Sequence, residues 1–121
     1  MRKLIIAAFM FVSSFGSNVM ADGHAIKMGI ILGFTGPIES LTPAMAASAE
    51  LAFKEASDSG SLLGGKYIKP IRADSTCVDS AAATAAAEGI ISQGVAAIMG
   101  ADCSGVTCLL YTSDAADDSL R

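Results

Sequence analysis

The clearest structural signal in this chain is IKMGIILGFTGP at residues 26–37, where a near-continuous apolar run ends in two glycines and a proline. Lys27 stands near the start of the run, and residues 28–32 are all apolar or glycine. A short run of this kind is typical of a strand buried on both faces of a sheet. The glycines and Pro37 then break regular structure and allow a tight turn. The sequence therefore predicts a central strand over 26–32, followed by a loop.

Ala-rich helical segments alternate with short apolar strands downstream of this loop. Thr42 is the predicted N-cap and Pro43 the first-turn residue of a helix over 44–59 that ends at Gly60. We expect its buried stripe to be Met45, Ala49, Ala52, Phe53 and Ala56.

The second helix and two further strands follow the same pattern. Residues 67–73 alternate apolar and basic side chains, and Pro70, which cannot donate to a ladder, places that strand at a sheet edge. Asp79 is the predicted N-cap of a helix over 80–93 that ends at Gly94, and residues 95–99 form the third strand. We expect this helix to bury Ala83, Ala87, Ile90 and Ile91.

This βαβαβ order predicts parallel strands joined by right-handed crossovers, with the first strand between the second and third. The fold class is therefore α/β, a three-layer doubly wound parallel sheet. Residues 22–107 supply at most one domain.

Residues 1–21 have the composition of a secretory leader. Met1-Arg2-Lys3 is basic, residues 4–12 are an unbroken apolar run, and Val19-Met20-Ala21 suits cleavage before Asp22. The apolar run is far shorter than the roughly 20 residues that span a bilayer, and no cysteine follows the cleavage point to carry a lipid. We expect an exported, soluble mature chain, the alternative being an uncleaved interfacial anchor.

The last fourteen residues of the chain, 108–121, do not continue the pattern of alternating strands and helices. Residues 108–117, CLLYTSDAAD, resemble one reading frame of a transposon-end adapter used in preparing sequencing libraries. On that interpretation the natural sequence stops near Thr107, residues 108–121 are a non-native tail and Cys108 is not part of the protein. The alternative is a genuine polar, acidic tail. In either case we expect no core element in 108–121 and no third helix covering the sheet.

Composition excludes some partners. The chain is 52% hydrophobic, and residues 22–107 contain five Lys and Arg against nine Asp and Glu, a net charge of −4. An acidic balance argues against binding nucleic acid through its phosphates. It also argues against attraction to anionic lipid.

Cys77 and Cys103 lie about three residues beyond the second and third strands. Those strands would run about 10 Å apart across the central one, too far for a disulfide, whose α-carbons lie within about 6 Å. In the loops past the strand ends, however, the chain can bend over the central strand, so a bridge is feasible. A zinc or nucleophilic thiol site is the alternative, but His24 is the sole histidine available to it. We expect no metal and no cofactor.

Four features resemble the start of a branched-chain amino acid ABC transporter substrate-binding protein, of the type I periplasmic binding protein family. They span nearly all of residues 24–107 and are the Ile26-Lys27 strand opening, the loop 33–37, Asp74-Ser75-Thr76-Cys77 and Gly100-Ala101-Asp102-Cys103-Ser104. The resemblance implies that residues 22–107 are part of the first of two lobes. It also implies a disulfide between Cys77 and Cys103, and that Ser104 holds the carboxylate of the ligand.

The position of Ser104 supports the last implication on physical grounds. Ligands of open parallel sheets bind beyond the carboxyl ends of the strands, where strand order reverses. A helix beginning just after Gly105 would direct free N–H groups, together with the Ser104 hydroxyl, at an anion. A simple N-cap role for Ser104 remains the alternative. Leu41 stands where some relatives place a tyrosine against the ligand, so their side-chain preference is not carried over.

The function implied is non-covalent capture of a small amino acid, branched-chain by resemblance, or a related amide, and its delivery to an inner-membrane ABC permease from the periplasm. A ligand-sensing domain of the same fold, in a receptor or regulator, is the alternative. An enzyme is not expected, because loop 33–36 matches neither GxGxxG nor a P-loop and no Ser-His-Asp or Cys-His set is available.

Overall fold

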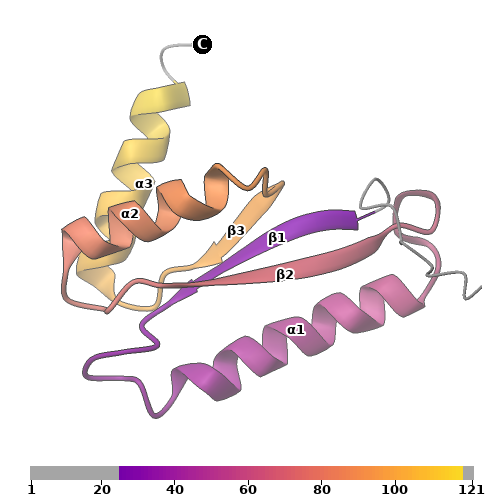
Figure 1. The fold of residues 1–121 in the computed structure, drawn as a ribbon, viewed down its shortest axis with the longest axis horizontal. Coiled ribbons are helices and arrows are strands. Elements are labelled where there is room, and N and C mark those ends of the chain that lie inside the picture. Colours follow the sequence, from indigo (N-terminus) through magenta and orange to yellow (C-terminus); the bar gives the residue numbers. More distant parts are fainter. Residues whose placement is uncertain (1–24, 119–121) are drawn as a thin grey trace, which may run out of the picture.

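In a computed structural model, which describes the backbone of residues 25–118 and the side chains of residues 25–112, the chain forms a parallel sheet flanked by helices (Figure 1). The elements in order are β1 Ala25–Leu32, α1 Thr42–Asp58, a short 3-10 helix Leu62–Gly64, β2 Tyr67–Asp74, α2 Ser80–Ile91, β3 Ala97–Gly100 and α3 Ser104–Asp118. The predicted leader, residues 1–21, and His24 lie outside the described residues.

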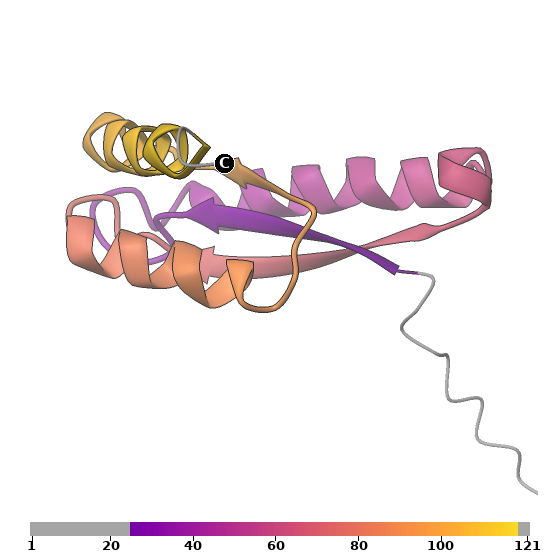
Figure 2. The ribbon, with the colours of Figure 1, turned by 90° about the horizontal axis from the view of Figure 1, so that it is seen from above.

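β1 lies between β2 and β3 and pairs in parallel with both. Ala25 is opposite Tyr67 at one end of the β1–β2 pair, and Ile31 is opposite Gly100 where β3 ends. The predicted α/β class, strand order and edge position of the proline-containing strand are confirmed. Figure 2 shows α1 and α2 on opposite sides of the sheet.

The side chains of β1 alternate between two small cores. Ile30 and Leu32 face α1, where they pack with the buried Ala46 and the partly buried Phe34, Ala49, Phe53 and Met99. Ile31 faces the other way and packs with Ala87 and Ile90 of α2. Because a strand covered on both faces gains burial from every residue, a continuous apolar run is what this position requires.

The start of α1 differs from the prediction. Thr42 is the first helical residue, not the N-cap, and its buried hydroxyl donates instead to the carbonyl of Gly33 at 3.1 Å. Of the predicted buried stripe, Ala49 and Phe53 pack on the core, and Ala46, which the stripe did not include, is buried, but Ala52 is exposed and Met45 is 43% exposed. These two side chains are exposed because no described element covers the flank of α1 to which they belong.

α2 begins as predicted, because the carboxylate of Asp79 accepts from the N–H groups of Ala81 and Ala82. Its buried residues are Ala83, Ala87 and Ile90, but Ile91 is 59% exposed, so that part of the predicted stripe is wrong. The helix ends at Ile91 rather than at residue 93.

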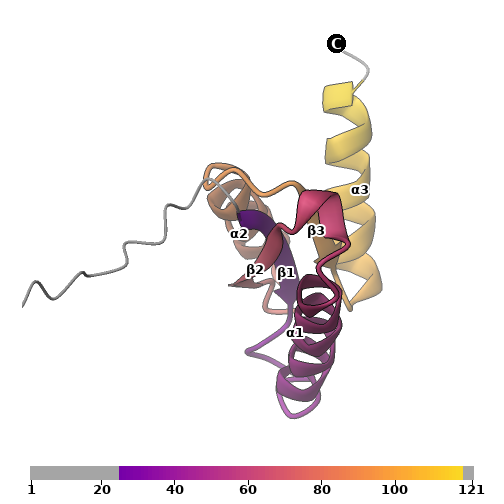
Figure 3. The ribbon, with the colours of Figure 1, turned by 90° about the vertical axis from the view of Figure 1, so that its right-hand side faces the viewer.

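α3 contradicts the expectation of no core element after Thr107. It runs from Ser104 to Asp118 and contacts α2, and Figure 3 shows it standing beside β3. Val106 is 2% exposed, and Leu110 packs on the cluster around Ile31. Val106, Leu109 and Leu110 have the i, i+3, i+4 spacing of an amphipathic helix, which is the sequence signal that was missed.

β3 is two residues shorter at its start than predicted and extends one residue further. Its last residue, Gly100, has a φ of +124°, and a Cβ at that position would collide with the carbonyl oxygen of Ile31. Only glycine allows the backbone to leave the ladder there. The next three residues therefore form a loop over the end of β1.

Candidate functional site

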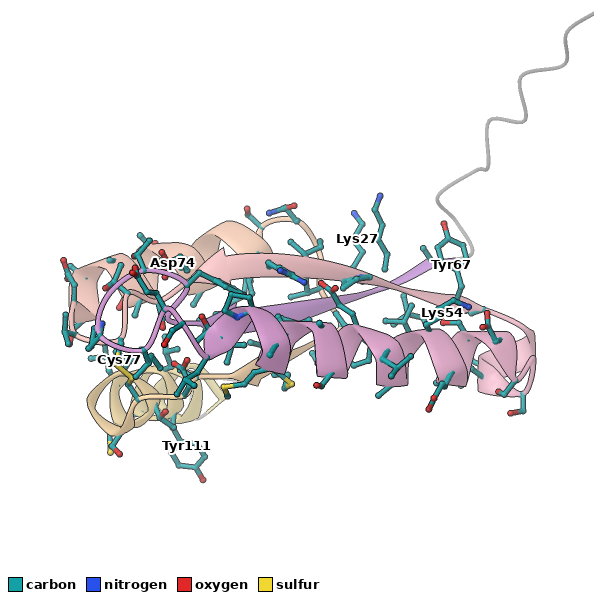
Figure 4. The ribbon with its side chains drawn as sticks, turned by 90° about the horizontal axis from the view of Figure 1, so that it is seen from below. Lys27, Lys54, Tyr67, Asp74, Cys77 and Tyr111 are labelled. Atoms are coloured by element: carbon teal, nitrogen blue, oxygen red, sulfur yellow. A yellow bond between two sulfur atoms is a disulfide. The ribbon has the colours of Figure 1, made fainter. Side chains whose placement is uncertain are left out.

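The carboxyl ends of the three strands meet at one edge of the sheet, and the loops that leave them are joined covalently. The Cys77–Cys103 disulfide connects the loop after β2 to the loop after β3, with their α-carbons 5.3 Å apart. The predicted pairing is confirmed. Figure 4 shows Cys77 at the same end of the molecule as Asp74, with Tyr67 and Lys54 toward the opposite end. Cys108 in α3 is an exposed free thiol.

Asp74 ties the loop after β1 to the end of β2. Its carboxylate accepts from the Thr35 hydroxyl at 2.6 Å, the Thr35 N–H at 3.3 Å and the Thr76 N–H at 2.8 Å. Partial burial alone would raise the pKa of Asp74, but these hydrogen bonds outweigh it and hold the pKa below its usual value. The carboxylate is therefore a structural anion of the site, suited to accepting hydrogen bonds at neutral pH.

The same loop is held from the β3 side by Asp102. Both carboxylate oxygens lie within hydrogen-bond distance of the Gly33 N–H, at 3.2 and 2.9 Å. The Gly33 carbonyl accepts from the Thr42 hydroxyl, so side chains satisfy both polar groups of this glycine. The sequence pattern did not predict this contact between Asp102 and Gly33.

The loop after β2 has an unusual backbone. Thr76 and Cys77 have φ values of 55° and 68°, in the left-handed region that residues with a Cβ seldom adopt. Gly36, with φ +99°, lies directly against this segment, because a Cβ there would come within 2.6 Å of the Thr76 carbonyl oxygen. The two loops are thus in close backbone contact, which the sequence showed only as a glycine-rich motif.

A buried hydroxyl lies directly beneath these loops. Ser75 is fully buried and its N–H donates to the carbonyl of Leu32 at 2.9 Å, but its Oγ has no hydrogen-bond partner among the described residues. Buried polar atoms are almost always paired. Ser75 is therefore the one orphan of this kind in the part of the chain that the structure describes.

The predicted ligand residues occupy two parts of this edge. Ser104 and Gly105 are the first two residues of α3, both exposed and immediately after the disulfide. The helix therefore begins two residues earlier than expected, and its first N–H groups lack intrahelical partners. Leu41 is 61% exposed at the start of α1, on the other face of the sheet.

An ion pair supports the α1 side of the rim. Arg72 of β2 forms two hydrogen bonds with the Glu50 carboxylate, at 2.6 and 2.8 Å, and its guanidinium lies 5.6 Å from the centre of the Phe34 ring. Hydrogen bonding lowers the pKa of Glu50 and raises that of Arg72. Because both groups are solvent-accessible, we expect the pair to contribute less than about 1 kcal/mol.

The sequence that forms this site matches a known protein family. Residues 25–111 match the family described as periplasmic binding protein. The chain belongs to the periplasmic binding protein family. A search of curated proteins found no match.

For a periplasmic binding protein, the edge where the strand ends meet is the expected place for a solute. Among residues 25–118, no group of three or more His, Cys, Asp and Glu side chains is placed to hold a metal ion. In the same range, no helix is long and apolar enough to cross a membrane. The edge carries hydroxyl groups, the first turn of α3 and the two carboxylates of Asp74 and Asp102, which hydrogen bonds hold in place.

Proposed function

We propose that this periplasmic binding protein captures a small amino acid without covalent chemistry and delivers it to an ABC permease in the inner membrane. Residues 22–107 would form part of one of the two lobes that close around the solute, after a leader over residues 1–21 has directed export to the periplasm. The ligand we favour is a branched-chain amino acid. A related amide is the next choice.

The observation that carries this proposal is the start of α3 at the rim. Ser104 and Gly105 are exposed at the first turn of a helix that directly follows the disulfide. The first N–H groups of a helix lack intrahelical partners, and the helix dipole favours an anion there. An amino acid carboxylate is an anion of the right size. The disulfide fixes this helix start over the end of β1.

The acidic groups of the rim are compatible with a zwitterion. Asp102 accepts from the N–H of Gly33, and Asp74 accepts from the N–H groups of Thr35 and Thr76. An ammonium group near them would find negative charge without needing to displace these hydrogen bonds. Leu41 offers an exposed apolar side chain on the α1 side. We propose that it contacts the aliphatic part of the ligand.

The test is a calorimetric titration of the product of the complete gene, including the continuation past residue 107, with L-leucine, L-isoleucine and L-valine. We expect Ser104→Ala to weaken binding about tenfold, since one hydrogen bond to a charged group is lost. Ser92→Ala is the matched control, because Ser92 is an exposed serine at the end of α2 whose hydroxyl bonds only to Gly89.

Unchanged affinity in Ser104→Ala would contradict the carboxylate role. Binding of none of the three amino acids, with binding of a small amide, would replace the ligand but keep the capture function. The 121-residue chain by itself should bind none of them at micromolar concentration, because we propose that half of the pocket lies in the second lobe.

A further inference from the structure

We propose that Asp102 is a positioning residue, which completes the β1–β3 ladder with its side chain and thereby fixes the start of α3 against the loop after β1. The proposal rests on the function above only in assigning the start of α3 to the ligand. Its structural content stands on hydrogen bonds within the described chain.

The backbone N–H and C=O groups of successive residues in β1 point alternately toward β2 and β3, and this alternation shows from which side Gly33 needs a hydrogen-bond partner. The carbonyl of Lys27 accepts from the Ala96 N–H, so the polar backbone groups of Lys27 point toward β3. The carbonyl of Leu32 accepts from the Ser75 N–H, so the polar backbone groups of Leu32 point toward β2. Because polar groups alternate along a strand, the N–H of Gly33 points toward the β3 side. It needs an acceptor from that side.

β3 does not supply that acceptor from its backbone. The last pair of the ladder is Ile31 with Gly100, after which the chain turns away. In a continued parallel ladder the Gly33 N–H would donate to the carbonyl of Ala101, but that carbonyl accepts from the Thr107 hydroxyl at 3.2 Å. The Asp102 carboxylate takes its place at 2.9 Å from the Gly33 nitrogen.

The hydrogen bond from Gly33 to the Asp102 side chain also positions the residues that follow Asp102. An aspartate just before a helix would ordinarily cap its own helix, whereas Asp102 reaches across to a residue 69 positions earlier in the chain. Cys103 and Ser104 follow directly. The bond therefore sets where the helix start and the disulfide sulfur lie relative to the glycine loop. Hydrogen bonds and disulfides that hold one loop in one place are thermodynamically coupled, and the coupling is reciprocal.

The test compares Asp102→Ala and Asp102→Asn in the oxidised 121-residue chain by amide hydrogen exchange. Asn retains a carbonyl oxygen that can accept from Gly33, whereas Ala does not. We expect the Gly33 amide to exchange at least tenfold faster in Asp102→Ala, and only a few-fold faster in Asp102→Asn, because a charged acceptor is replaced by a neutral one. Exchange at Ile30, in the middle of β1, should change little.

The second readout is the equilibrium of the Cys77–Cys103 disulfide with dithiothreitol. We expect Asp102→Ala to make the bridge about tenfold easier to reduce, with Asp102→Asn close to the parent, because loss of the bond frees the loop that carries Cys103. Asp79→Ala is the matched control. It removes a carboxylate that caps α2 near the same rim but does not contact Gly33.

Unchanged Gly33 exchange in Asp102→Ala would overturn the proposal, as would equal effects in Asp79→Ala. If Asp102→Ala does not fold, Asp102→Asn carries the test alone, and a Gly33 amide as slow as the parent would then overturn it. Neither readout uses a ligand. Failure of the amino acid titrations therefore leaves this result standing, and failure here leaves the capture function untouched.

Discussion

Removing the disulfide is the perturbation for which the structure gives the most definite magnitude. Cys77 and Cys103 are separated by 26 positions. In the chain-entropy treatment, closing a loop of that length stabilises the folded state by about 3.5 kcal/mol at 25 °C. Thr76 and Cys77 have left-handed backbone that costs of order 1 kcal/mol each, and part of that cost is relieved when the bridge is absent. We expect a net loss of about 2 to 3 kcal/mol.

The variant for this experiment is Cys77→Ala combined with Cys103→Ala, because a single replacement would leave a thiol free to pair with Cys108. Urea unfolding followed by circular dichroism gives the free energy of unfolding of both proteins. For a chain of this size, the melting temperature should also fall by at least 8 °C. Cys108→Ala is the control, and we expect it to change stability by less than about 0.5 kcal/mol because that thiol is exposed.

A loss below about 1 kcal/mol in the double variant would refute the reasoning, since it would mean that the two loops are held together equally well without the bridge. A loss of similar size in Cys108→Ala would refute it too. In that case the stabilising cysteine would be the one in α3.

Two further predictions concern the buried edge of the sheet. Because the pKa of Asp74 is lowered in the folded state, its ionised carboxylate contributes fully to the free energy of unfolding above the ordinary pKa of about 3.9, and this contribution is lost as the pH falls through the lower folded value. In urea unfolding between pH 7 and pH 3, we expect the free energy of unfolding to decline less steeply for Asp74→Asn than for the parent. Equal slopes would contradict this prediction. Ser75→Ala removes a buried hydroxyl without a partner, so we expect it to leave stability unchanged or raise it by up to about 1 kcal/mol. A loss above 1 kcal/mol in urea unfolding would show instead that this hydroxyl is paired in solution.

The sequence predicted the sheet well because its signals are local and unambiguous. The apolar run of residues 26–32 fits a strand buried on both faces, and Pro70 favours a sheet edge. Asp79 followed by an Ala-rich segment likewise identified the start of α2. The pairing of Cys77 with Cys103 was reached from strand geometry and resemblance together, and the structure confirms it.

The features that were predicted wrongly or not at all depend mostly on contacts between elements far apart in the sequence. Met45 and Ala52 were wrongly included in the buried stripe of α1 because they are apolar, although no described element covers them, whereas Ala49 and Phe53 pack on the core as predicted. The contacts of Asp74 and Asp102 were not predicted because they depend on tertiary position across 39 and 69 residues, which periodicity does not encode. The continuation of α3 past Thr107 was missed because residues 108–121 were interpreted as a foreign or polar, acidic tail, although Leu109 and Leu110 continue the helical spacing from Val106. Whether residues 108–121 are foreign stays a prediction.

The central position of β1 has a consequence for how the chain is made. Ala25 lies opposite Tyr67 and Met28 lies opposite Ala97, so β1 cannot complete its pairing until β2 and β3 have been synthesised. During synthesis, the hydrophobic strand β1 therefore emerges before the other strands of the sheet and is fully buried only after they have formed. Folding dominated by such distant pairings is slow. Until the third strand arrives, this segment is the natural target for a holding chaperone and the natural starting point for aggregation.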